Sequence, residues 1–128
     1  MRKSDPYSRH SFKGRISQLV RKFIWGMDIA PNVHIAQTAL IDRTWPKGVH
    51  IAEGCIFGDE SVLLTHDMVR GVYCDTHVGA RTIVGPRAII MPGITIGADC
   101  VLEPGAVVTK SVPDRSRAVG NPAVISPL

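Results

Sequence analysis

Branched aliphatic residues recur every six positions along the second half of the chain. They are Val78, Val84, Ile90, Ile96, Leu102 and Val108, and a small or modest side chain usually follows each four residues later. Gly and Pro recur in the same frame. An interior Gly or Pro costs an α-helix about 1 to 3 kcal/mol, whereas short strands closed by turns accept this punctuation. The pattern therefore predicts short strands separated by turns.

The same frame continues upstream in two shorter blocks. The first consists of Ile29, Ile35 and Ile41, and the second of Ile51, Phe57 and Leu63. The repeat is interrupted twice, by extra residues around 45–48 and by a loop over 65–77. We expect function at these interruptions, because a repetitive scaffold carries its chemistry on departures from the repeat.

This hexad pattern resembles the left-handed parallel β-helix of the hexapeptide-repeat acyltransferases. The resemblance implies an all-β fold with three hexads per coil and four coils, grouped as 29/35/41, 51/57/63, 78/84/90 and 96/102/108. A small β-sandwich also has short strands with Gly and Pro, but twelve hexads in one frame argue against it. Such a short column buries little on its own, so we expect an oligomer, and the resemblance implies a homotrimer.

The ends of the chain differ from the repeat. We divide the sequence into a basic N-terminal segment (1–28), a β-helix domain (29–113) and a C-terminal tail (114–128). Apolar residues between Phe12 and Met27 recur at helical spacing, which predicts an amphipathic helix. That helix either contacts a membrane surface or an acidic partner, or it caps the open edge of the first coil. Because solenoids normally carry caps, we favour the cap.

Composition narrows the class of protein. The 128 residues are 45% hydrophobic and 20% charged, as expected of one globular domain. The first 25 residues hold seven of the Lys and Arg and one acid, but the remainder is slightly acidic, so we expect no nucleic-acid partner. Neither a membrane-spanning run nor a secretory signal is evident, and we expect a cytoplasmic protein. The three cysteines form no CxxC pair, which favours reduced thiols.

The C-terminal sequence adds a second resemblance. Residues 92–128 contain PGITIGADCVLEPGAVVTK and, further on, VGNPAVI. These stretches resemble the terminal segments of maltose, galactoside and exopolysaccharide O-acetyltransferases. The resemblance implies acetyl-CoA as acyl donor, a sugar or polysaccharide precursor as acceptor, no metal, and direct transfer without a covalent enzyme intermediate.

Acetyl transfer to a hydroxyl needs a general base, and histidine titrates near neutral pH. His10 lies in the basic segment, and His34 and His50 are expected to face solvent. His66 stands where the repeat breaks, and its surroundings resemble the Thr-x-Thr-His or Ser-His-Asp segment that holds the catalytic base of these O-acetyltransferases. We therefore predict His66 as the base. Either Asp67 or Asp42 could fix its tautomer, and the sequence leaves both open.

The resemblance also implies substrate-binding residues. For the acceptor, Thr38 and Asp42 lie in the zone where related enzymes bind sugar hydroxyls, and His77 resembles a second histidine of serine acetyltransferases. For coenzyme A, the implied residues are Gly85, Pro86, Pro104, Thr109 and Lys110. The family often has Arg after NPA, where this chain has Val124, so Arg115 and Arg117 are candidate replacements.

Three other functions stay open. One is N-acetylation of an amino sugar attached to a nucleotide, by the same base. Another is a γ-type carbonic anhydrase, which uses three histidines around a metal. That alternative is disfavoured because the stretches 84–87 and 91–93 contain no histidine. The third is a non-catalytic β-helix scaffold, which the departure at Val124 favours.

Overall fold

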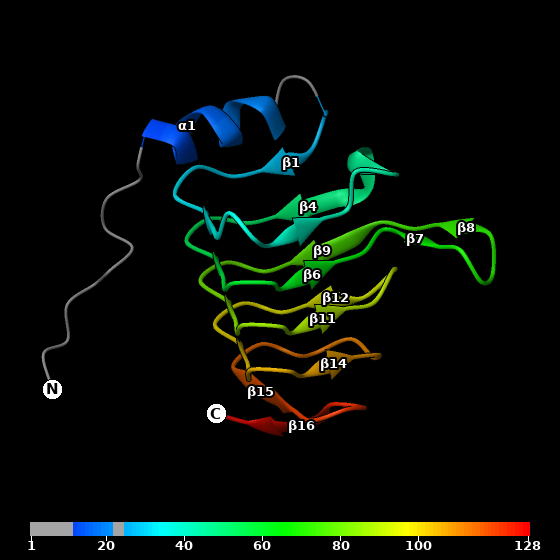
Figure 1. Cartoon of the computed structure of the whole chain (residues 1–128). Coiled ribbons are helices and arrows are strands. Elements are labelled where there is room, and N and C mark those ends of the chain that lie inside the picture. Colours follow the sequence, from blue (N-terminus) through cyan, green and yellow to red (C-terminus); the bar gives the residue numbers. More distant parts are fainter. Residues whose placement is uncertain (1–11, 22–24) are drawn as a thin grey trace, which may run out of the picture.

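The structure is a computed structural model and describes residues 12–21 and 25–128. Its main body is a column of short parallel strands (Figure 1). The first sheet contains β1 (Asp28–Ile29), β4 (Val49–Ile51), β9 (Thr76–Val78) and β12 (Thr95–Ile96), in that order. The third sheet contains β3 (Leu40–Ile41), β6 (Val62–Leu63), β11 (Ile89–Ile90) and β14 (Val107–Val108).

The second sheet is longer than the other two. It begins with β2 (His34–Ile35), β5 (Ile56–Phe57), β10 (Ile83–Val84) and β13 (Val101–Leu102). It continues into β15 (Ser116–Val119), which is parallel to β13, and β16 (Val124–Pro127), which is antiparallel to β15. Residues 114–128, which the sequence separates as a tail, thus add two strands at the C-terminal end of the column.

The four predicted coils are confirmed by the strand register. In the first sheet Ile29 pairs with Ile51, Ile51 with Val78, and Val78 with Ile96. The other two sheets repeat this alignment for the second and third residue of each coil. Eleven of these twelve residues are buried; Ile35 is partly buried and packs against the core that the others form. The hexad frame therefore determined which residue stacks on which.

The helix is shorter than its apolar pattern predicts. We expected a helix from Phe12 to Met27, whereas α1 spans Phe12–Leu19 and is followed by one wider turn at residues 20–21. It lies over the N-terminal end of the column, as Figure 1 shows. Ile16 and Leu19 remain 46% and 55% exposed. In the described ranges, no helix has the length and apolar character of a membrane span.

Candidate active site

Both interruptions of the repeat leave the column at the same corner. The first follows β3 and contains the 3₁₀ turn Pro46–Gly48. The second follows β6 and contains a hairpin of β7 (His66–Asp67) and β8 (Val72–Tyr73), which projects from the column in Figure 1. Because β3 and β6 are neighbours in the third sheet, the two excursions begin side by side.

Aromatic and polar contacts join the two excursions. The rings of Trp45 and Tyr73 stack with centroids 5.3 Å apart. The hydroxyl of buried Thr65 donates a hydrogen bond to the Trp45 carbonyl at 2.7 Å. A Cβ on Gly48 would lie 2.5 Å from the carbonyl oxygen of Cys74, so only glycine allows this close approach. These contacts fix the hairpin relative to the column.

The Asp42 carboxylate is the centre of this corner. It is 3% exposed, and its oxygens accept hydrogen bonds from the backbone N–H groups of Thr44 and Thr65 at 2.9 Å and of His66 at 3.2 Å. Burial acts to raise the pKa of Asp42, but the hydrogen bonds from Thr65, Thr44 and His66 outweigh it and lower that pKa. Asp42 is therefore ionised near neutral pH.

His66 is hydrogen-bonded to this carboxylate. Its Nδ1 lies 2.5 Å from Asp42 Oδ2, and its side chain is 19% exposed. An ionised carboxylate only accepts hydrogen bonds, so Nδ1 donates its proton to Asp42, and the neutral form of the ring has its lone pair on Nε2. A cavity of about 350 Å³ lies beside the ring, between Thr44 and the hairpin. The arrangement can accept a proton from a ligand in that cavity.

Asp67, the other candidate for orienting His66, has different partners. Its Oδ1 accepts hydrogen bonds from the backbone N–H groups of Val69 and Arg70, and its Oδ2 from the Arg70 guanidinium. The backbone N–H of Arg70 is the main cause of the lowered pKa of Asp67. Asp67 thus stabilises the tip of the hairpin, whereas Asp42 contacts the His66 ring.

The chain is similar to known proteins in part of its sequence and in its fold. Residues 75–110 match the model of the family described as bacterial transferase hexapeptide (six repeats). Protein SACOL2570 of Staphylococcus aureus (strain COL) is 45% identical over 49 residues, which are 38% of this chain and 25% of that protein. Residues 75–110 therefore resemble the hexapeptide repeats of that family. The matched part of the chain spans 25% of the length of the staphylococcal relative.

Solved structures establish the fold of the chain. A maltose O-acetyltransferase from Clostridium difficile 630 has a TM-score of 0.62 and 24% identity, over 94% of this chain and 79% of that one. A galactoside acetyltransferase in complex with coenzyme A has a TM-score of 0.65 and 17% identity, over 94% and 73% of the two chains. The expected left-handed parallel β-helix is confirmed by these likenesses.

The residues predicted to bind coenzyme A lie at both edges of the third sheet. Gly85 and Pro86 follow β10, and Pro104 follows β13, at the edge next to the second sheet. Thr109 and Lys110 follow β14 and are exposed at the other edge, the one at which His66 follows β6. A Cβ on Gly85 would lie 2.7 Å from the Leu102 carbonyl oxygen, which explains this glycine by coil stacking alone.

The candidate cations near the C-terminus differ in their pairing. Arg117 Nε lies 3.1 Å from Glu103 Oε1. Arg115 is exposed in a left-handed turn with φ of 53°, and it has no salt bridge within the described ranges. Of the two, only Arg117 is therefore paired with a described carboxylate at salt-bridge distance.

The residues predicted to bind the acceptor do not gather around His66. The hydroxyl of Thr38 donates to Asp59 and accepts from the backbone of Glu60, at the opposite end of β3 from Asp42. His77 lies on the first sheet, where its ring stacks on His50 with centroids 4.4 Å apart. Only Asp42, of the residues predicted for the acceptor, contacts His66.

His50 has more partners than its sequence position suggested. Its Nδ1 lies 3.0 Å from Asp28 Oδ2, and its Nε2 lies 2.9 Å from Asp75 Oδ1. The hydrogen bond with Asp28 is the main cause of the raised pKa of His50, and Asp75 adds to it. His10 lies outside the described residues.

Sequence reasoning missed the contacts that hold the site in place. Thr65 precedes the predicted base directly, and a small hydroxyl residue at that point was the available signal. Trp45 and Tyr73 carried no signal, because their stacking depends on how two separate excursions fold toward each other. Arg21 and Arg43, which share a cavity beneath α1, were also missed.

Proposed function

We propose that this chain is an acetyl-CoA-dependent O-acetyltransferase that acts on a hydroxyl group of a sugar or polysaccharide precursor. His66 is the general base, and Asp42 orients it. The observation that best supports this proposal is the hydrogen bond between His66 Nδ1 and the buried Asp42 carboxylate. The matched family, the solved maltose enzyme and the coenzyme A bound to the galactoside enzyme support the choice of reaction and donor.

The reaction follows from the tautomer that Asp42 imposes. Nε2 of His66 takes the proton of the acceptor hydroxyl while the hydroxyl oxygen attacks the thioester carbonyl carbon. The tetrahedral intermediate collapses by breaking the carbon–sulfur bond. The protonated ring then returns its proton to the departing thiolate, so that coenzyme A leaves as a thiol and the base is regenerated. Asp42 stays ionised throughout and stabilises the imidazolium.

A neighbouring copy completes this site in a homotrimer. The cavity of about 350 Å³ beside His66 is too small for acetyl-CoA together with a sugar. The hairpin that carries His66 exposes Met68 by 85% and Val69 by 97% at its tip, where a second copy would cover them. We assign the trimer to the cytoplasm, in keeping with its three free cysteines.

A thiol-release assay tests this function. Purified protein is given acetyl-CoA with a panel of sugars, oligosaccharides and nucleotide sugars, and the products are identified by mass spectrometry. Mild alkali releases acetate from an ester but not from an amide, which separates O- from N-acetylation. His66→Ala should lose about 100- to 10,000-fold in activity.

The matched control is His34→Ala, which removes a partly buried histidine from the second sheet. It should retain activity if it melts at the temperature of the wild type. If His66→Ala is folded and turns over acceptor at the wild-type rate, His66 is not the base and the proposal fails.

A further inference from the structure

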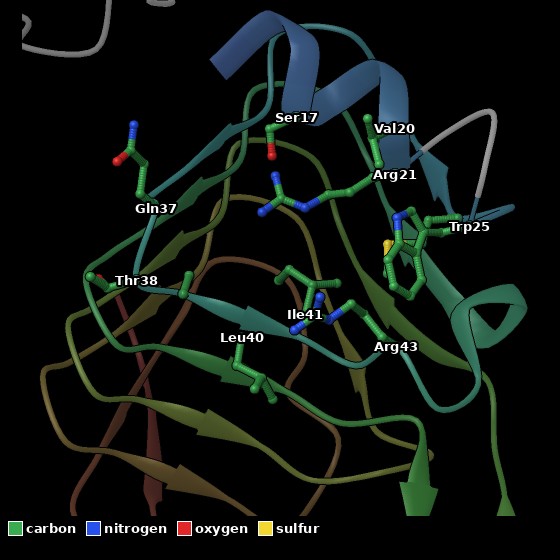
Figure 2. Close-up of a pocket in the computed structure, with 11 residues that line it drawn as sticks. Ser17, Val20, Arg21, Trp25, Gln37, Thr38, Leu40, Ile41 and Arg43 are labelled. Carbon is green, nitrogen blue, oxygen red and sulfur yellow. The ribbon is translucent and has the colours of Figure 1, made fainter. Parts of the chain in front are cut away.

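A second cavity lies between α1 and the first coil. Its volume is about 500 Å³, within the range of small-molecule sites. Ser17 and Arg21 line it from the helical side, and Leu40 and Arg43 line it from the third sheet. Figure 2 shows both guanidinium groups directed into this space, with the Trp25 ring at its edge. The cavity is therefore open to a ligand and carries two positive charges.

Neither arginine has an acidic partner among residues 12–21 and 25–128. Arg43 Cζ instead lies 5.2 Å from the centre of the Trp25 ring. Burial, together with the nearby charge of Arg43, lowers the pKa of Arg21. Four other arginines of this chain do form salt bridges with carboxylates; these are Arg70, Arg81, Arg87 and Arg117. Arg115 also has no salt bridge within the part of the chain that the structure describes, but it does not line this cavity; Arg21 and Arg43 together provide two unpaired positive charges for an anion bound there.

Phosphate is the anion that this geometry fits. Guanidinium groups bind phosphate oxygens through pairs of parallel N–H bonds, and two of them can balance two negative charges. The Ser17 hydroxyl supplies another donor on the same wall. Leu40 and Trp25 give the cavity an apolar side that suits the organic part of a ligand. The Thr38 hydroxyl is already engaged with Asp59 and is not needed.

We propose that the cavity between α1 and the first coil binds the phosphate group of a small phosphorylated molecule through Arg21 and Arg43. Binding itself requires no acetyl transfer. Arg43 follows Asp42 directly, and Thr44 lines the cavity beside His66, so one short segment contributes to both cavities. A phosphorylated acceptor is the substrate class this favours, an extension that rests on the proposed function.

Calorimetric titration of the full chain tests the site. The probes are inorganic phosphate, pyrophosphate, glucose 1-phosphate and glucose, at constant ionic strength set with sodium chloride. The phosphorylated probes should bind with saturation, and glucose should not. Tighter binding of glucose 1-phosphate than of inorganic phosphate identifies an organic ligand, and the reverse order would restrict the site to the free anion and overturn the proposal.

Three variants assign the binding. Arg21→Gln and Arg43→Gln should each weaken binding of glucose 1-phosphate at least tenfold, because each removes charge-assisted hydrogen bonds. Arg87→Gln removes an exposed arginine of another coil and is the control. Should Arg21→Gln fail to fold, Arg43→Gln decides alone. The proposal would be overturned if the wild-type protein showed no saturable binding of glucose 1-phosphate, or if both cavity variants bound it as tightly as the wild type.

A kinetic arm separates this inference from the proposed function. Saturable binding of phosphorylated probes without any acetyl transfer supports the site while the enzymatic proposal fails. Acetyl transfer to neutral sugars by a protein that binds no phosphate supports the enzyme and overturns the site.

Discussion

Replacing Asp42 by Asn removes the charge that sets the His66 tautomer while keeping the size of the side chain. The carboxylate accepts hydrogen bonds from three backbone N–H groups and from the His66 ring. An amide has one acceptor oxygen, so its NH₂ group must face either Thr44 or the pair formed by Thr65 and His66. An amide that donates to Nδ1 would also place the ring proton on Nε2, where the base is needed.

The expected loss of activity is large. General-base catalysis contributes about 100- to 10,000-fold, equivalent to about 3 to 5 kcal/mol of barrier. Asp42→Asn should lose most of that factor, and His66→Ala should lose all of it. The double variant should be no slower than His66→Ala alone, because Asp42 acts only through the ring.

Stability changes in the same variant, with a defined pH dependence. Hydrogen bonds to a charged group contribute about 1.5 to 3 kcal/mol each, so we expect Asp42→Asn to cost about 2 to 4 kcal/mol. Because the pKa of Asp42 is lowered in the folded protein, the cost is full above the ordinary carboxyl pKa of 3.8. It shrinks as the pH falls through the lowered pKa of Asp42.

Urea unfolding between pH 3 and pH 8 and thiol release at a temperature where every variant is folded provide the measurements. Asp99→Asn, which changes an exposed carboxylate paired with Arg81, is the control and should leave activity unchanged. Activity of folded Asp42→Asn within threefold of the wild type would refute the orienting role. So would additive losses in the double variant with His66→Ala.

Three further outcomes are expected. The Asp28 carboxylate raises the pKa of His50, so their interaction stabilises the fold fully below the ordinary histidine pKa of 6.5 and is lost as the pH rises through the raised pKa. His50→Gln should remove this pH dependence of stability, worth less than about 1 kcal/mol, from thermal melts recorded over that pH range. A pH dependence equal to that of the wild type would count against the pair. Gly48→Ala forces a methyl group against the Cys74 carbonyl, so it should lower the free energy of unfolding in urea by about 1 to 3 kcal/mol and also lower the activity. An unchanged free energy of unfolding would mean that the two excursions can move apart without cost. Val69→Asp changes a 97% exposed side chain and should weaken the proposed trimer in sedimentation velocity while the fold is retained. An unaltered sedimentation coefficient would contradict the proposed subunit contact at the hairpin tip.

The column could be predicted from the sequence because its order is local and repeated. Each coil places its aliphatic residue on the equivalent one in the next coil, so the spacing alone fixes the partners of Ile41 and Leu63. The same register places Asp42 beside the start of the second excursion. The hexad alignment could therefore have predicted Asp42 rather than Asp67 as the partner of His66. This prediction requires extending the alignment of stacked residues by one position beyond the end of each strand.

The rest depends on segments that the repeat does not govern. The apolar spacing extended the helix to Met27, whereas α1 ends at Leu19 and residues 22–24 lie outside the described range, because helical periodicity does not fix where a helix ends. Arg21 and Arg43 line the same cavity because of the way α1 lies over the first coil. A hexad pattern carries no information on that placement.

Because both excursions leave the column at a single corner, the fold and the ligand selectivity beside His66 depend on different sets of residues. Residues can be inserted, deleted or exchanged there without shifting any interior aliphatic out of line with the coil above or below. Proteins built on such a column can therefore change the ligand bound beside His66 by remodelling two neighbouring loops, while the stacked aliphatic residues of the interior keep the fold.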